Sequence, residues 1–202
     1  GTSTAEVFEM ISGRFRPVGA MSVARPGHSA ALLQDGTVLI VGGTGLSTTE
    51  IYDSSTGTFS SGPSLTSISG GTRAVRLLDG KVLVTRANDT SSAKDAELYD
   101  PTTKTFSKLT RRTVAELTPV PMANGNVLYA GSGAAEIYRP SSNDFVEITA
   151  PAELGGLLSA VPLGNGALLY GATGVGTSTG SSFTFTKGAW TFDGASTFIR
   201  RA

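Results

Sequence analysis

Residues 24–43 read ARPGHSAALLQDGTVLIVGG and hold the pattern that decides the fold. Two short apolar segments flank an Asp-Gly pair, and a double glycine follows the second segment. An Asp-Gly pair between alternating apolar residues is a strong local indication of a β-hairpin. The stretch therefore predicts two antiparallel strands, and its recurrence along the chain decides the architecture.

The hairpin pattern recurs three more times. LLDGKVLVTRA occupies 77–87, MANGNVLYAGS occupies 122–132 and LGNGALLYGAT occupies 163–173. The period is about 44 residues, and a period in this range indicates a repeat architecture. The glycines of the four turns are Gly36, Gly80, Gly125 and Gly166.

A second pattern lies between the hairpins. It reads TEIYDSSTGTF at 49–59, AELYDPTTKTF at 96–106 and AEIYRPSSNDF at 135–145, with AEVFEMISGRF at 5–15 before the first hairpin. Each copy predicts a strand ending in an aromatic residue, a polar turn, and a second aromatic that opens the next strand. The repeating unit is therefore four short strands. The first aromatic of each copy is expected to pack in the core, at Phe8, Tyr52, Tyr99 and Tyr138.

Four strands in a period of 40 to 50 residues are typical of a propeller blade. The double glycine, the AELYDP segment and the closing aromatic recur in the same order, which resembles kelch repeats, particularly the bacterial galactose-oxidase-like type. Arg25-Pro26-Gly27-His28-Ser29 resembles the start of that family's first strand. The resemblance covers residues 5–173 and implies an all-β, kelch-type β-propeller, with 1–202 as a single domain.

The number of blades depends on the tail. Residues 5–16 supply the outer strands of a blade with no inner hairpin before them, and a closed ring usually completes such a blade from its other terminus. The tail WTFDGASTFIRRA, at 190–202, contains an Asp-Gly turn. We therefore predict five blades, the fifth built from 188–202 inside and 5–16 outside. Two alternatives stay open: four blades, with the N-terminal strands closing on 157–173, or a part of a six- or seven-bladed ring.

Charge and composition limit the partners. Lys and Arg number 16 and Asp and Glu number 16, so no broad attraction to nucleic acid or anionic lipid is expected. The chain has no cysteine, which excludes disulfides and thiolate metal sites, and no apolar run approaches the roughly 20 residues that cross a bilayer. We expect a monomer without cofactor, metal, nucleic-acid or membrane partner. The family resemblance implies a secreted or cell-surface protein.

Functional residues in a propeller are expected in loops around the channel mouth, where the repeat is broken. Arg86 replaces the first glycine of Gly42-Gly43, and Arg200 lies at the same offset from its own turn glycine. Guanidinium groups there would suit a carboxylate, a sulfate or a sugar acid. The ligand-binding candidates are Arg25, His28, Arg73, Arg86 and Arg200, with stacking on Tyr170 or Trp190 if either is exposed.

A structural interpretation of the same residues stays open beside the functional one. His28, the single histidine, would then bond to the backbone of its own blade. The arginines would form exposed ion pairs with Asp89, Asp95 and Glu116, which contribute little to stability.

Copper-radical oxidases belong to the family that the repeats resemble, and their site depends on a cysteine crosslinked to tyrosine and on histidine ligands. A chain with one histidine and no cysteine cannot build that site. We therefore predict a non-catalytic module that recognises a glycan or a protein through loops at the channel mouth. The alternatives are a carbohydrate-active hydrolase, lyase or epimerase on an acidic sugar, with His28 or an acidic residue as base, and a structural, truncated or engineered propeller without a ligand.

Overall fold

The computed structural model describes residues 1–87, 95–109, 118–131, 134–148, 158–163, 166–174, 185–192 and 198–201. Every regular element in these ranges is a strand. The described residues include no helix that is long and apolar enough to cross a membrane. The chain divides into two compact units: Gly1–Asn88 with Asp95–Leu109, and Asp89–Lys94 with Thr110–Ala202.

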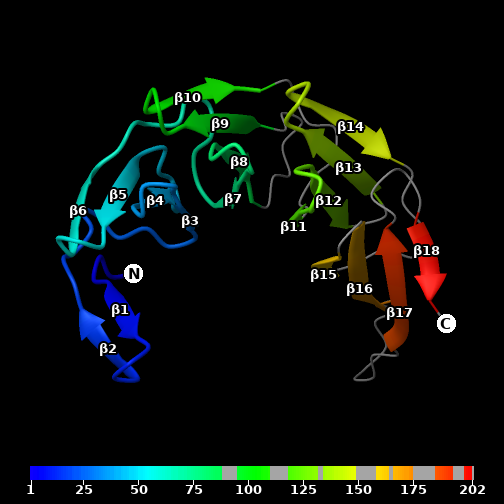
Figure 1. The fold of residues 1–202 in the computed structure, drawn as a ribbon, viewed down its shortest axis with the longest axis horizontal. Coiled ribbons are helices and arrows are strands. Elements are labelled where there is room, and N and C mark those ends of the chain that lie inside the picture. The colour runs from blue at the N-terminus through cyan, green and yellow to red at the C-terminus, as the bar shows by residue number, and fades with distance from the viewer. Residues whose placement is uncertain are drawn as a thin grey trace. The chain divides into compact units, whose positions relative to one another are not determined.

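The first unit contains one two-stranded sheet and two four-stranded sheets, all antiparallel and in chain order (Figure 1). The small sheet pairs β1 (Glu6–Glu9) with β2 (Arg14–Pro17). The next sheet consists of β3 (Ser29–Leu32), β4 (Val38–Val41), β5 (Thr49–Asp53) and β6 (Thr58–Ser61). The third consists of β7 (Thr72–Arg76), β8 (Val82–Arg86), β9 (Ala96–Asp100) and β10 (Thr105–Lys108).

The second unit contains two more four-stranded antiparallel sheets of the same order. One consists of β11 (Thr118–Pro121), β12 (Val127–Gly131), β13 (Ala134–Arg139) and β14 (Asp144–Ile148). The other consists of β15 (Leu158–Leu163), β16 (Gly166–Gly174), β17 (Phe185–Phe192) and β18 (Phe198–Arg201). The predicted all-β class and the repeating unit of four strands are confirmed.

The predicted role of the tail is wrong. Strand β17 pairs with β16, with Phe192 opposite Ala167, and β18 pairs with β17. The described residues of the predicted hairpin, 188–192 and 198–201, therefore form the last two strands of the sheet of β15–β18 and not the inner hairpin of a fifth sheet. Among the described strands β1 pairs with β2. The five-blade closure and the alternative closure on 157–173 are not confirmed and stay predictions. The pairing of β17 with β16 has a local cause. Strand β16 extends over nine residues, and the next strand in the chain pairs along its free edge.

Alternating side chains of the first unit build its core. Leu39, Val41, Val82 and Val84 come from the second strands of the two larger sheets, and Ile68 from the connection between them. Strands β3 and β7 are in contact, so the cluster is continuous between these sheets. The aromatic pattern predicted core positions correctly at Tyr52, Tyr99 and Tyr138, which are buried, but not at Phe8, which is half exposed.

Candidate functional site

Arg25 is a buried structural residue of the first unit. Its Nε donates to Glu50 Oε1 at 2.8 Å, and Nη1 donates to the carbonyl oxygens of Gly42 at 3.0 Å and Thr48 at 2.9 Å. The residue is 3% exposed. The guanidinium therefore ties the segment before β3 to the β4–β5 connection, and a ligand would have to replace these bonds.

Glu50 has a counterpart that the sequence analysis missed. Glu97 occupies the same place on β9 and is fully buried. Its carboxylate accepts the backbone N–H groups of Thr66, Ser67 and Ile68, in the loop that leads into β7. Burial raises the pKa of Glu97, but these hydrogen bonds outweigh burial and hold the pKa below its ordinary value. The signal was present in the sequence, because the same strand position carries a glutamate in every copy of the second pattern.

His28 and Arg73 lie on the first strands or just before them. His28 is exposed, and its Nδ1–H donates to the backbone oxygen of Arg25 at 2.7 Å. Arg73 lies on β7 opposite Thr85, half-buried. Its Nε has no hydrogen-bond partner among the described residues. This nitrogen is buried, so it is not open to a ligand from solvent.

Arg86 extends β8 beyond the point where β4 ends, in place of the positive-φ Gly42. Its Nη2 donates to Asp95 Oδ2 at 3.1 Å, and Lys108 Nζ lies 3.7 Å from Asp95 Oδ1. The predicted pairing with Asp95 is therefore formed. Arg200 lies on β18 opposite Trp190, and its side chain is outside the described part, as are Asp89, Glu116 and the side chain of Tyr170. Ligand binding by the five candidates stays a prediction.

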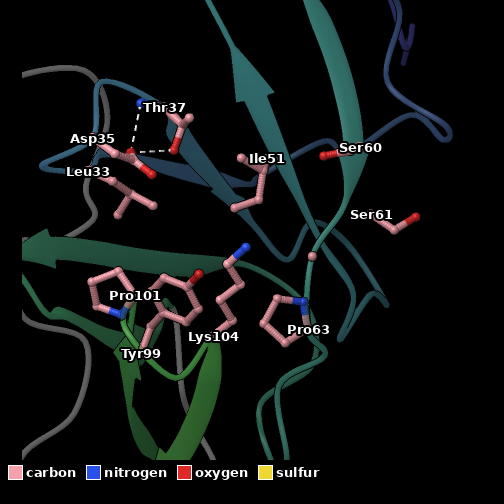
Figure 2. A pocket seen from close by; sticks show the side chains of 11 residues that line it. Leu33, Asp35, Thr37, Ile51, Ser60, Ser61, Pro63, Tyr99, Pro101 and Lys104 are labelled. Atoms are coloured by element: carbon pink, nitrogen blue, oxygen red, sulfur yellow. Dashed lines mark hydrogen bonds between the residues drawn. The ribbon is translucent and has the colours of Figure 1, made fainter.

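A different set of residues surrounds a pocket of about 210 Å³ in the first unit (Figure 2). The pocket lies between the sheet of β3–β6 and the sheet of β7–β10, because both contribute to its wall. Its lining combines hydroxyl, carboxylate and ammonium groups with aliphatic and proline surfaces. The lining residues are Leu33, Asp35, Thr37, Ile51, Ser60, Ser61, Gly62, Pro63, Tyr99, Pro101 and Lys104.

Asp35 is fixed by the hairpin turn that the opening sequence predicts. Its Oδ1 accepts the hydroxyl of Thr37 at 2.7 Å and the backbone N–H of Thr37 at 3.0 Å. The hydrogen bond from the Thr37 hydroxyl lowers the pKa of Asp35 most, and the bond from the Thr37 backbone N–H lowers it further. The positive charge of Lys104 acts in the same direction. The carboxylate is therefore ionised at neutral pH. The next two hairpins repeat this turn with Asp79 and Asn124, which accept the N–H two residues on.

Lys104 is held in an unusual backbone conformation. It lies in the turn between β9 and β10 with φ 56°, where the corresponding turn positions hold Gly57 at φ 70°, Gly13 at φ 64° and Asn143 at φ 58°. A non-glycine residue in this left-handed region costs about 1–2 kcal/mol. Strain of this kind gathers at functional sites, and the lysine side chain points into the pocket.

The rest of the pocket lining presents hydroxyl groups beside apolar side chains. Figure 2 shows Tyr99 and Lys104 entering the pocket from the same side, with Ser60 and Ser61 of β6 on another. Burial, with the negative charges of Asp35 and Asp100, raises the pKa of Tyr99, so its hydroxyl keeps its proton. Sequence analysis missed this site because most of the lining follows the repeat. The available signal was the lysine that replaces glycine at position 104.

Neither the pocket nor the rest of the described chain fits a copper centre. The described residues contain no group of three His, Cys, Asp or Glu side chains that could hold a metal ion. The full sequence has one histidine and no cysteine. The donors present therefore do not fit the copper-radical site of the oxidases that belong to the resembled family.

Comparisons with known proteins identify the fold alone. No family model and no curated protein matches the chain. A solved structure described as a "novel fungal alcohol oxidase with catalytic diversity among the AA5 family, in complex with copper" is similar over 100% of this chain, with a TM-score of 0.71 and 17% identity. The alignment covers 47% of that oxidase, so this chain spans about half its length. The likeness defines a galactose-oxidase-like, all-β fold.

Proposed function

We propose that this chain is a non-catalytic recognition module that binds a glycan through the pocket around Asp35 and Lys104. We also propose that the fold is a kelch-type β-propeller in which each four-stranded sheet is one blade. The recurrence of the two sequence patterns and the galactose-oxidase-like fold support the architecture. The pocket is the single observation that carries the functional proposal.

The chemistry of the lining matches a sugar residue. A sugar has hydroxyl groups that donate and accept hydrogen bonds, which the Asp35 carboxylate and Lys104 ammonium can satisfy together. Its C–H faces can pack on the surfaces of Ile51, Pro63 and Pro101. Pockets for drug-sized ligands are about 300–1,000 Å³, so the 210 Å³ here suits one sugar residue or the end of a glycan.

Binding fits this pocket better than catalysis. Glycoside hydrolysis uses two carboxyl groups on either side of the scissile bond, whereas Asp35 is the one carboxylate in the lining. Its lowered pKa also makes Asp35 a weak base at neutral pH. A monomeric, secreted or cell-surface protein, located where glycans are displayed, is consistent with this proposal.

Arg73 is the sequence-derived candidate that extends the proposal. Arg73 is half-buried and forms no ion pair with a described residue, whereas Arg25 and Arg86 are paired with Glu50 and Asp95. We include Arg73 as an additional contact for an acidic group on a glycan or protein, outside the pocket.

The pocket is tested by screening the full chain against a glycan array and measuring the affinity of the best glycan by calorimetry. We expect Lys104→Gly and Asp35→Asn each to weaken binding at least fivefold. Lys104→Gly supplies the residue of the equivalent turns, so it should raise the free energy of unfolding by up to about 1 kcal/mol. Any loss of binding is then independent of folding.

Asp79→Asn is the matched control, because it makes the same change in the sister turn, outside the pocket. Asn124 shows that asparagine supports this turn, so both Asp→Asn variants should fold. We expect the control to bind within twofold of the wild type. Absence of binding to any glycan, or equal binding by Lys104→Gly, Asp35→Asn and the wild type, would contradict the proposal.

A further inference from the structure

The tyrosines of β9 and β13 occupy equivalent positions in the repeat but differ in hydrogen bonding. The hydroxyl of Tyr138, on β13, donates to Oδ1 of Asn143 at 2.6 Å. Asn143 lies in the β13–β14 turn with φ 58°, and the equivalent position of the β9–β10 turn holds Lys104 with φ 56°. The turn residue therefore accepts the tyrosine hydroxyl in one sheet and is replaced by lysine in the other.

Lysine cannot take over the role of asparagine, because an ammonium group has three donors and no acceptor. No described residue forms a hydrogen bond with the hydroxyl of Tyr99. Tyr99 is nevertheless only 2% exposed, and its hydroxyl is directed into the pocket (Figure 2). Buried polar groups nearly always have a hydrogen-bond partner. The molecule that fills the pocket is therefore expected to supply an acceptor for this hydroxyl.

The ammonium group of Lys104 is a second donor on the same side of the pocket. It forms no ion pair with a described residue, whereas Lys108, on the next strand, lies 3.7 Å from Asp95. Lys104 and Tyr99 belong to the sheet of β7–β10. Two donors from one sheet suit a single carbonyl oxygen, which has two lone pairs.

An acceptor lies on the other sheet. Oδ1 of Asp35 accepts both hydrogen bonds from Thr37, and no other described residue donates to Oδ2. Asp35 belongs to the β3–β4 turn, and Figure 2 shows it on the other side of the pocket from Tyr99 and Lys104. A ligand between the two sheets would therefore donate toward Asp35 and accept from the opposite side.

The charges of the lining favour a neutral ligand. Asp35 and Lys104 are the one carboxylate and the one ammonium group among the lining residues. A ligand carboxylate or sulfate would add a second negative charge beside Asp35, and like charges in a partly buried site repel each other. A trans secondary amide is neutral, and its N–H and C=O point in opposite directions. Such a group matches the donors and the acceptor of the two sheets.

We propose that the sugar bound in this pocket carries an acetamido group. Its N–H donates to Asp35 Oδ2, and its carbonyl oxygen accepts from Tyr99 Oη and Lys104 Nζ. Its methyl group packs beside Leu33 and Ile51, which supply apolar surface in the lining. This inference rests on the proposed glycan-binding function and adds the chemical group that the pocket recognises.

Matched pairs of sugars isolate the contribution of the acetamido group. The methyl glycosides of N-acetylglucosamine and N-acetylgalactosamine are compared with methyl glucoside and methyl galactoside by calorimetry on the full chain. Each pair differs only in an acetamido group or a hydroxyl. We expect at least one acetamido sugar to bind tenfold or more tightly than its hydroxyl parent. Methyl glucuronide, which carries a carboxylate, should bind no more tightly than methyl glucoside.

Tyr99→Phe removes the hydroxyl and keeps the ring that packs against Phe106, 5.1 Å away between centroids. Because no described residue bonds to this hydroxyl, the midpoint of unfolding should stay unchanged. The preference for the acetamido sugar over its parent should fall at least fivefold. A purely structural role of Tyr99 would not produce this combination.

Lys104→Asn introduces the turn residue of the β13–β14 turn, which accepts the tyrosine hydroxyl there. It should engage the hydroxyl of Tyr99 and remove the acetamido preference without loss of stability. Tyr138→Phe is the matched control outside the pocket. Its midpoint of unfolding should fall, because the bond to Asn143 is lost, while the acetamido preference persists.

The results separate this inference from the proposed function. The inference is overturned if the acetamido sugars bind no more tightly than their parents, or if Tyr99→Phe or Lys104→Asn retains the preference. If a hydroxyl sugar or the glucuronide binds equally well and Asp35→Asn weakens its binding, the acetamido assignment alone fails and glycan binding stands. If neither these sugars nor any glycan on the array binds, both fail.

Discussion

Single buried carboxylates organise the loops that lead into the first strands. Glu97 receives five hydrogen bonds, from the N–H groups of Thr66, Ser67 and Ile68 and from the hydroxyls of Thr66 and Ser67. An ionised acceptor makes such bonds roughly twice as strong as neutral ones. The residue therefore stabilises the fold, although a charge at a buried strand position is uncommon.

Glu97→Gln should lower the free energy of unfolding by about 2–4 kcal/mol, because the amide nitrogen would face donors that the carboxylate now satisfies. Denaturant unfolding of the two proteins at neutral pH measures this loss. Glu6→Gln is the matched control on the exposed equivalent strand, and its effect should stay within about 0.5 kcal/mol. Equal effects of the two substitutions would contradict this account of Glu97.

The lowered pKa of Glu97 gives its contribution a definite pH dependence. The stabilisation is complete above the ordinary glutamate pKa of 4.5 and is lost as the pH falls through the lower pKa of the folded state. The stability difference between wild type and Glu97→Gln should therefore shrink as the pH falls below 4.5, measured by unfolding at a series of pH values. A difference that stays constant down to pH 2 would show that Glu97 does not titrate as described.

At the scale of the elements, the double glycine marks a close approach of two segments. Gly43 has φ 116°, and a Cβ placed there would lie 2.9 Å from Arg25 Cα and 3.1 Å from Arg25 C. Gly45, in the same β4–β5 connection, has φ 74° and nothing within 4 Å of its ideal Cβ. Substitution of Gly45 therefore tests backbone strain alone, whereas substitution of Gly43 adds a steric clash.

Gly43→Ala should reduce the free energy of unfolding by more than about 2 kcal/mol, since strain and a clash with fixed backbone combine. Gly45→Ala carries the strain alone and should cost about 1 kcal/mol. Thermal or denaturant unfolding of both variants measures the difference. If the two lose equal stability, the contact with Arg25 does not restrict position 43.

The sequence predicted these elements well where the information is local. The Asp-Gly turn at Asp35 and the strand ending at Tyr52 follow from neighbouring residues, and both recur with a fixed period. The pairing of β17 with β16 was not predicted, because the edge with which a strand pairs depends on how the sheet packs and not on the strand's own residues, although the two strands are consecutive in the chain. The site was missed for a related reason: Lys104, Ser60 and Asp35 meet only after two sheets pack together.

At the scale of the whole molecule, the described chain repeats one antiparallel unit in each four-stranded sheet, and its differences from the repeat are specific. One is the lysine at position 104, which contributes an ammonium group to a pocket between two sheets. Another is the sheet of β1 and β2, which has two described strands where the others have four. A fold does not by itself determine a function, so the function has to be tested at the pocket itself.

The most direct test is an NMR titration of the isotopically labelled full chain with the best glycan from the array. The account predicts that amide shifts change at Asp35, Ser60, Ser61, Tyr99 and Lys104, in proportion to occupancy. The amide shifts of His28 and Arg86 should change far less. Shift changes concentrated at His28, Arg73 and Arg86, with the pocket residues unmoved, would contradict the central claim.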